Sequence, residues 1–287
     1  MRVAGFSIVR DATRLDFPFE AAVASVLPVV DEFVLVVGHS SDDTLARAQA
    51  MADPRLRLVE SEWDFSLGSA VLAVETDRAM HSCHAEWGIY IQADEVLANG
   101  AAAALRQAID RHDTHSEVEG LLVDYRHFYG GFDTVALDRG WYRHEVRAIR
   151  LNPALGIHSF RDAQGFRVGP EDRRIRAARS GAVMHHYGWA RPAWALRSKR
   201  AQDRIIYDTE RQKDPERPLL PWFPGLRPFV DEHPAPVAEW IATRRNREQL
   251  VEAPRWNRKE AVARVTFALE RASGWRPFEF RNYMLVR

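Results

Sequence analysis

The chain has 287 residues, of which 46% are hydrophobic and 28% charged, and its 40 basic residues balance its 40 acidic residues. This composition is ordinary for a soluble globular protein, and the zero net charge argues against nucleic acid as its main partner. Cys83 is the only cysteine, which excludes an intrachain disulfide and a cysteine-based zinc site and fits a cytoplasmic location. We expect neither a transmembrane segment nor a signal peptide.

The charges are unevenly distributed along the chain. Residues 1–190 contain 20 basic against 27 acidic residues, whereas residues 191–287 contain 20 against 13. An acidic front and a basic back predict two regions that dock on each other. The alternative is a basic tail that faces an anionic acceptor or makes peripheral contact with a membrane.

Strands and helices alternate through the first hundred residues. Compact apolar runs predict strands at 3–9, 33–37, 56–59 and 87–91, with helical patterns between them. This alternation is typical of an α/β fold with a mixed, mainly parallel sheet flanked by helices. The first strand is followed by Arg10-Asp11-Ala12-Thr13, so neither a dinucleotide fingerprint nor a P-loop is present.

The pattern changes after residue 120. Aromatic-rich runs predict further strands at 121–129, 146–151 and 181–187, and we expect residues 157–169 to form a long active-site loop. Beyond Trp189 the pattern predicts helices at 193–211 and 239–250. We therefore expect a domain at residues 1–190 and a helical C-terminal extension at residues 191–287 packed on it.

Two acids, Asp94 and Glu95, follow the predicted strand 87–91. A buried strand that ends in an acid brings it to the carboxyl edge of a parallel sheet, where open α/β folds bind ligands. An aspartate at that edge can hold a divalent cation, which in turn can neutralise a diphosphate. Solvated loop acids beside a helix N-terminus are the alternative interpretation.

The loop Gly38-His39-Ser40-Ser41-Asp42-Asp43-Thr44 and the turn Gln92-Ala93-Asp94-Glu95 together resemble family 2 glycosyltransferases. Further matching phrases occur in the order of a bacterial subgroup of predicted glycosyltransferases: residues 5–11, 62–64, 71–76, 127–130, 162–167 and 186–189. The resemblance covers roughly residues 3–195. It departs from the family at Gln92, which stands where the first acid of the DxD motif usually lies, and at Val37-Gly38, where many members have an acid that binds the nucleobase.

The resemblance implies a GT-A fold and an inverting glycosyltransferase of the hexosyltransferase type. The expected donor is a nucleotide-sugar, above all a UDP-sugar. The expected acceptor is a glycan, a lipid-linked glycan or another molecule with a hydroxyl group. The expected role is the synthesis of cell-envelope polysaccharide. The cofactor implied is Mg²⁺ or Mn²⁺, held by Asp94 and His186. The donor contacts implied are Val9, Arg10, Gly38, His39, Ser40, Asp77, Gln92, Ala93 and Asp94.

Inverting transfer needs a general base for the acceptor hydroxyl. Glu145 is the first candidate, His144 the second, and Asp162 the third. A surface acid paired with Arg143 or Arg147 is the other interpretation of Glu145. Alternation along the strand 181–187 places His185 on the side opposite His186, as a structural residue.

Two other functions stay open at this point. A sugar-nucleotide pyrophosphorylase shares the architecture but needs a glycine-rich phosphate loop after the first strand. A catalytically silent nucleotide- or sugar-binding protein on the same fold is favoured by Gln92 and Val37.

Overall fold

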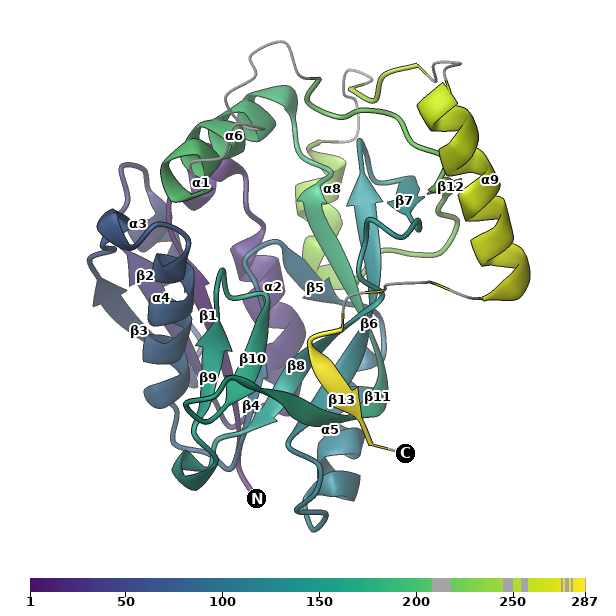
Figure 1. Cartoon of the computed structure of the whole chain (residues 1–287). Helices are drawn as coiled ribbons and strands as arrows, with labels where there is room; N and C mark the ends of the chain where they lie inside the picture. Colours follow the sequence, from purple (N-terminus) through teal and green to yellow (C-terminus); the bar gives the residue numbers. More distant parts are fainter. Residues whose placement is uncertain are drawn as a thin grey trace.

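The computed structural model describes residues 1–207, 218–244, 250–253, 258–274, 276, 279 and 281–286. Its N-terminal half is a run of parallel strands in the order β3-β2-β1-β4. These strands are β1 (Val3–Val9), β2 (Glu32–Gly38), β3 (Leu56–Ser61) and β4 (Trp87–Tyr90). The helices between them are α1 (Ala12–Leu15), α2 (Phe19–Val26), α3 (Thr44–Gln49) and α4 (Ala70–His81), as Figure 1 shows.

Antiparallel strands continue the sheet beyond β4. β8 (His144–Arg150) pairs with β4, and β6 (Gly120–Tyr129) pairs with β8, both antiparallel. The long strand β11 (Arg173–Trp189) then runs parallel to β6. β9 (Ile157–Phe160) and β10 (Gly165–Val168) complete this edge. The predicted mixed α/β fold, with a largely parallel sheet flanked by helices, is confirmed.

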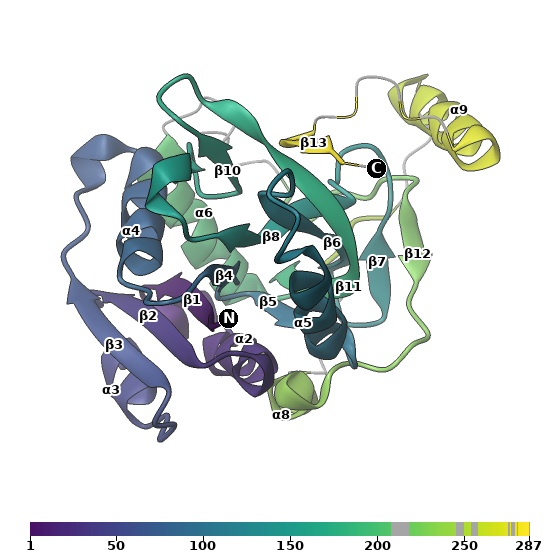
Figure 2. The ribbon, with the colours of Figure 1, turned by 90° about the horizontal axis from the view of Figure 1, so that it is seen from below.

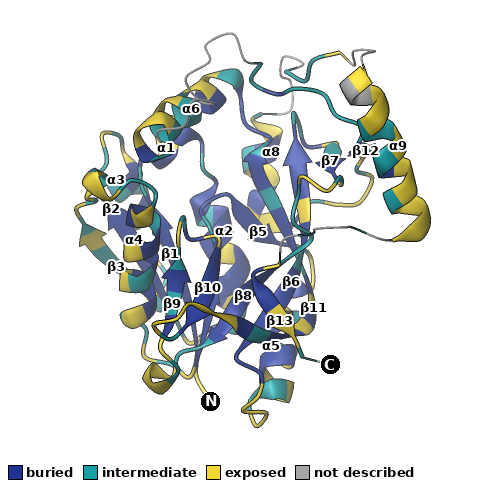
Figure 3. Cartoon of the chain, in the orientation of Figure 1, coloured by how far each residue is buried: buried dark blue, intermediate teal, exposed yellow. Residues whose placement is uncertain are grey.

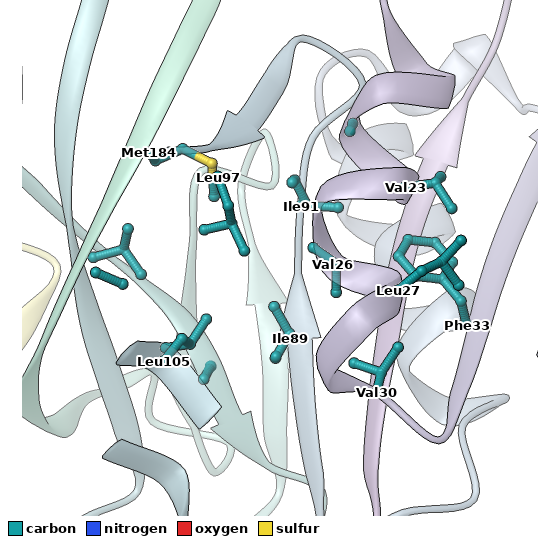
Figure 4. Packing of buried hydrophobic residues seen from close by; sticks show 14 of the residues in the cluster. Val23, Val26, Leu27, Val30, Phe33, Ile89, Ile91, Leu97, Leu105 and Met184 are labelled. Carbon is teal, nitrogen blue, oxygen red and sulfur yellow. The ribbon is translucent and has the colours of Figure 1, made fainter. Parts of the chain in front are cut away.

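Alternating side chains supply two hydrophobic cores, one on each face of the sheet. On one face, α2 and α5 (Ala101–His112) pack on β1, β2 and β4, and Figure 4 shows Val26, Ile89 and Leu105 in this core. On the other face, α4 and the β9–β10 hairpin pack on Phe6 and Tyr90. Figure 2 shows the sheet between these two layers.

The predicted long loop at residues 157–169 is wrong, because β9 and β10 form a two-stranded hairpin in that range. Alternation is weak in these two short strands, and their pairing was not visible in the sequence. β5 (Glu95–Leu97) was also missed, because a three-residue strand is too short to carry a period. It pairs antiparallel with β11, opposite Met184, His185 and His186.

The C-terminal region adds strands as well as helices. The helices described in this region are α6 (Ala193–Tyr207), α8 (Ala238–Ala242) and α9 (Arg258–Ser273). β12 (Leu226–Pro228) pairs with β7 (Thr134–Ala136), and β13 (Tyr283–Leu285) pairs with β11. Residues 208–211 and 245–249 of the two predicted helices lie outside the described residues. The domain boundary at residue 190 stays a prediction.

The described residues also form short 3₁₀ turns: η1 (Leu27–Val29), η2 (Phe65–Leu67), η3 (Pro153–Leu155) and η4 (Ala235–Val237). Figure 3 shows that the strands are largely buried, whereas much of α6 and α9 is exposed. None of the described helices is both long enough and apolar enough to cross a bilayer.

Candidate functional site

A cleft of about 910 Å³ opens at the carboxyl ends of β1 and β4. Its inner wall comes from Val9, Arg10 and the turn Gln92-Ala93-Asp94. The other walls come from the β9–β10 turn, from α6, and from an aromatic group formed by Tyr129, Trp141, Trp189 and Phe223. The position matches the rule that α/β sheets bind ligands at the carboxyl ends of their strands.

The pairing of β5 with β11 brings Asp94 and His186 together although 92 positions separate them. The backbone N–H of Tyr187 donates to the carbonyl of Asp94 at 2.8 Å, and Glu95 lies opposite His186 in the ladder. As a result, His186 Nε2 lies 3.7 Å from Asp94 Oδ2. Both side chains line the cleft.

Hydrogen bonds fix which nitrogen of His186 faces Asp94. His127 Nε2 lies 2.8 Å from the carbonyl oxygen of Tyr142, which can only accept, so this nitrogen donates. Burial, followed by the nearby His186, lowers the pKa of His127 well below its usual value, so His127 is neutral. Its Nδ1 then accepts from His186 Nδ1 at 2.8 Å. His186 therefore turns its Nε2 toward Asp94 and the cleft.

The space between the two side chains depends on Gly188. A Cβ atom at this position would lie 2.5 Å from His186 Nε2 and 2.8 Å from Asp94 Oδ2. Glycine therefore keeps open the place where a cation would lie. A carboxylate oxygen and an imidazole whose other nitrogen is held by a hydrogen bond are suitable ligands for Mg²⁺ or Mn²⁺. The residues present fit such an ion.

The site offers two protein ligands, because no group of three His, Cys, Asp or Glu side chains with metal-binding geometry occurs among the described residues. The nearby amide of Gln92 does not add a charge. A cation held by Asp94 and His186 would need the remaining ligands from phosphate oxygens and water, which is usual for Mg²⁺.

Two cations near Asp94 were not identified from the sequence. Arg191 is fully buried, donates to the carbonyls of Leu15 and Gly188 at 2.7 and 2.8 Å, and lies 3.7 Å from Asp94 Oδ2. Lys199 of α6 lines the cleft, and its Nζ lies 5.7 Å from the ring centroid of Trp189. Both lie at the end of the resemblance or beyond it, so only the fold reveals them.

The charges around Asp94 keep it ionised. Burial alone would raise its pKa, but His186, Arg191 and Lys199 together hold the pKa well below its usual value. A buried carboxylate that stays charged is available to a cation over the whole physiological pH range.

Gln92 has a different role from the acid that it replaces. Its Nε2 donates to the carbonyl of Ala163 at 3.3 Å, and its backbone N–H donates to Glu95 at 3.0 Å. Ala163 lies in the β9–β10 turn next to Asp162, and Arg161 and Ala163 both have positive φ values of 56° and 59°. The amide therefore anchors a strained turn that presents Asp162 to the cleft.

Glu95 proves to be structural. It is fully buried, accepts from Arg147 Nη2 at 2.9 Å and Nε at 3.1 Å, and accepts from the Tyr125 hydroxyl at 2.6 Å. Arg147 lies between the rings of Tyr90 and Tyr125, with 5.3 Å to each centroid. The alternative interpretation, a solvated pair of loop acids, is therefore wrong for both Asp94 and Glu95.

The loop after β2 is held by Asp11. The carboxylate of Asp11 accepts a hydrogen bond from the backbone N–H of Ser41 at 2.9 Å. The backbone N–H of Asp11 donates to Ser40 Oγ at 3.0 Å. Arg10 Nε donates to the carbonyl of His39 at 2.9 Å. Among the residues of this region that were predicted to contact the nucleotide-sugar, Val9 and Arg10 line the cleft. Gly38, His39 and Ser40 are not among the described residues that line it.

Gly38 nevertheless shapes the cleft, because a side chain at this position would overlap the indole of Trp63, which lines it. Asp77 is also outside the described lining. Its Oδ1 accepts from the backbone N–H of Ser159 at 2.6 Å, so it anchors β9 on α4. This contact gives Asp77 a role in packing, and its binding of the donor stays a prediction.

The structure does not bring Glu145 to the cleft. Its side chain is buried near Asn282, whose Nδ2 lies 3.5 Å from Glu145 Oε1, and no described residue donates to Oε2. His144 also faces elsewhere, with Nδ1 at 2.6 Å from Asp124 Oδ1. Of the three predicted bases, Asp162 alone is among the described residues of the cleft lining. The three candidate bases lie on neighbouring segments of the sequence. Only the strand register shows which of their side chains face the cleft.

Burial also changes the chemistry of Glu145. It raises the pKa of this carboxyl to about 7, although Arg147 acts in the opposite direction. His185, as predicted, lies on the opposite side of β11 from His186, where its ring is packed against Phe128 and Phe229.

No family model and no curated protein matches the chain, whereas solved structures do. TarS of S. aureus (residues 1–349) is 13% identical, with a TM-score of 0.43 over 73% of this chain and 66% of that one. The glucosyl-3-phosphoglycerate synthase of Mycobacterium tuberculosis, solved with Mn²⁺ and UDP, is 18% identical, with a TM-score of 0.29 over 45% of each chain.

TarS has also been solved with UDP and with UDP-GlcNAc, and the matches to these two structures cover 38% and 36% of that chain. This chain thus spans less than two thirds of the length of the first structures that it matches. A mycobacterial protein is 13% identical, with a TM-score of 0.37 over 71% of this chain and 74% of that one. These identities and TM-scores are low, so the likeness concerns the fold alone and assigns no role to single residues.

Proposed function

We propose that the protein is an inverting glycosyltransferase that moves a sugar from a nucleotide-sugar, foremost a UDP-sugar, to the hydroxyl of a glycan or lipid-linked glycan. The observation that carries the proposal is the pair Asp94 and His186, held open by Gly188 at the inner end of a cleft of about 910 Å³. A divalent cation bound by the pair would neutralise negative charge on the diphosphate.

The donor half of the cleft is formed by the ends of β1 and β4. Arg10 and Lys199 line it and supply positive charge for phosphate oxygens. Arg191, which lies behind Asp94, holds that carboxylate in place without reaching the cleft lining. The nucleobase is assigned to the side of Trp63, whose ring lines the same half.

The acceptor half is aromatic. The rings of Trp141 and Trp189 lie edge to face with their centroids 6.0 Å apart, and the rings of Tyr129 and Phe223 are 5.1 Å apart. All four line the cleft. Aromatic faces of this kind bind the apolar faces of sugar rings, whereas Asp138 and Asp203 on the same walls offer acceptors for sugar hydroxyls.

We assign Asp162 as the general base in place of Glu145. Its carboxylate takes the proton of the acceptor hydroxyl while the acceptor oxygen bonds to the anomeric carbon. The bond from that carbon to the diphosphate oxygen breaks, and its electron pair leaves with the diphosphate. Attack from the face opposite the diphosphate inverts the anomeric carbon. Tyr207, whose hydroxyl donates to Asp162 Oδ2 at 3.3 Å, orients the carboxylate.

The test begins with calorimetry of UDP binding with and without Mn²⁺. We expect binding that depends on Mn²⁺ and that weakens at least about tenfold in Asp94→Asn. Asp138→Asn, a cleft acid on the other wall, is the matched control and should bind UDP normally. Binding that is independent of the metal, or equal in both variants, would contradict the assignment of Asp94.

Turnover separates the enzyme from a silent binding protein. Donor hydrolysis or transfer should fall roughly 10²-fold in Asp162→Asn, the usual range for loss of a general base, with UDP affinity unchanged. Glu145→Gln should keep its turnover. Metal-dependent UDP binding with no turnover of any UDP-sugar in the wild-type protein would instead support the binding protein.

A further inference from the structure

Helix α9 exposes an apolar face. Val262, Val265 and Leu269 are 61%, 62% and 63% exposed, and their spacing of three and four positions places them on one side of the helix. Three alanines are exposed on the same side: Ala261, Ala268 and Ala272. None of the described residues covers this face. A surface helix usually turns its apolar face to the core, so this face indicates a partner.

The opposite side of α9 is held against the protein. Phe267 is buried there, with the guanidinium of Arg227 at 4.7 Å from its ring centroid, and the guanidinium of Arg264 lies 4.4 Å from the ring of Trp222. Trp222 adjoins Phe223, which lines the cleft. The helix is therefore docked behind one wall of the cleft with its apolar face turned outward.

Helix α6 has a similar outer face on the other side of the cleft. Trp194 and Ile205 are 51% and 64% exposed, and Arg197, Ala201 and Arg204 share their side of the helix. The inner side of α6 lines the cleft with Lys199, Gln202, Asp203 and Ile206. Figures 1 and 3 show the two helices apart from each other, both with exposed surface.

Arginines accompany the apolar residues on both helices. On α9, Arg258 is exposed on the side of Val262 and Leu269, and on α6 Arg197 and Arg204 are exposed beside Trp194 and Ile205. Both helices belong to the region with 20 basic against 13 acidic residues. Exposed Trp, Ile, Val and Leu combined with arginine are typical of helices that lie in the interface of an anionic membrane.

We propose that α6 and α9 dock the protein on an anionic lipid surface. A second copy of the chain fits less well, because the apolar residues lie on two separate helices rather than on one continuous patch of about 800 Å², which a stable protein partner needs. Pairing of the same face with itself would also bring arginines of equal charge together. A lipid surface does not require one continuous patch, and it is complementary to the charge of both helices.

Docking in this way has a consequence for the cleft, which rests on the function proposed above. Because α6 forms one wall and α9 supports the opposite one, the opening would lie beside the lipid headgroups. A lipid-linked acceptor would then reach Asp162 without leaving the membrane.

Co-sedimentation with vesicles tests the proposal on the full chain and requires no donor, so its outcome is independent of whether the cleft is active. Vesicles of phosphatidylcholine alone are compared with vesicles containing 30% phosphatidylglycerol, on the order of natural anionic content. We expect binding to the anionic vesicles only, with binding lost at high salt. Arg258→Gln and Arg197→Gln should each weaken binding by about fivefold.

The apolar face is tested with Val265→Glu combined with Leu269→Glu, and separately with Trp194→Glu; both should weaken binding at least about tenfold. Val74→Glu, an exposed apolar position on α4, is the matched control and should bind as the wild type does. Equal binding to neutral vesicles, no binding to either kind, or loss in Val74→Glu would overturn the proposal. So would a concentration-dependent dimer that the α9 variant abolishes.

Discussion

His186 and His127 face each other through their Nδ1 atoms, 2.8 Å apart, and this contact determines which nitrogen His186 offers to the cleft. His127 is fixed in turn by the carbonyl of Tyr142. The two rings come from β11 and β6, which pair in parallel at this very position. A ligand histidine whose second nitrogen is held by a buried partner is a common arrangement at metal sites.

Replacing His127 tests this arrangement. His127→Phe keeps a ring in the same buried space but removes the acceptor of the His186 hydrogen bond, so the imidazole is free to rotate. We expect Mn²⁺ affinity in the presence of UDP to fall 10- to 100-fold, the usual effect of losing such a partner. His185→Phe, a buried histidine on the other side of β11, should leave the affinity unchanged. Equal effects of the two substitutions on metal affinity would count against the proposed role.

Gly188→Ala tests the space between Asp94 and His186. The added methyl group would overlap His186 Nε2, which must move away from Asp94. We expect at least a tenfold loss of Mn²⁺ affinity, measured by calorimetry, with the melting temperature little changed because His186 is the end of a movable side chain. Gly131→Ala is the control, since a Cβ there meets no atom within 4 Å. Normal metal binding in Gly188→Ala would show that no ion lies between these side chains.

Gln92→Met tests the anchor of the Asp162 turn. Methionine matches the length of glutamine but cannot donate to the carbonyl of Ala163. We expect kcat to fall about tenfold because Asp162 is no longer held in position, while the dissociation constant for UDP stays the same. Gln164→Met, on the same turn and exposed, should be nearly neutral in both measurements. A loss of UDP affinity with kcat intact would mean that Gln92 contacts the donor instead.

Glu145 should make stability depend on pH. Its pKa is raised to about 7 by burial, above the value of about 4.3 expected in the unfolded chain. The folded protein therefore holds a proton that the unfolded chain releases between these values, and the stability linked to this group is lost as the pH rises from about 4.3 to 7. Glu145→Gln should remove this loss. Relative to the wild type, the free energy of unfolding of the variant should be higher at pH 8 than at pH 4 by on the order of 3 kcal/mol.

Urea unfolding at pH 4, 6 and 8 measures the effect. Glu119→Gln should change the pH dependence of stability in the opposite direction. Burial opposes ionisation of Glu119, but hydrogen bonds from Arg173 and Arg176 hold its pKa below the usual value. That variant should lose stability at pH 8. An unchanged pH profile in Glu145→Gln would show that Glu145 is ionised in the folded state.

The sequence by itself determined the α/β alternation, the strand before Asp94 and the residue types that carry the proposed chemistry. Buried parallel strands are continuous apolar runs, and their ends are marked by polar residues, so both are visible along the chain. The motif order also pointed to the end of the sheet where the cleft lies. His185 and His186 were distinguished by strand alternation alone, because the side-chain period of two is a local property.

Tertiary structure decided which of these residues meet. The pairing of β5 with β11 joins Asp94 to His186, and the register of β6 with β11 supplies His127. The register of β8 with β6 turns Glu145 inward, and the pairing of β9 with β10 leaves Asp162 at the cleft. Contacts between strands far apart in the sequence depend on strand order and register, which a one-dimensional pattern does not contain. That is why Arg191, Lys199 and the role of Gln92 became visible only in the fold.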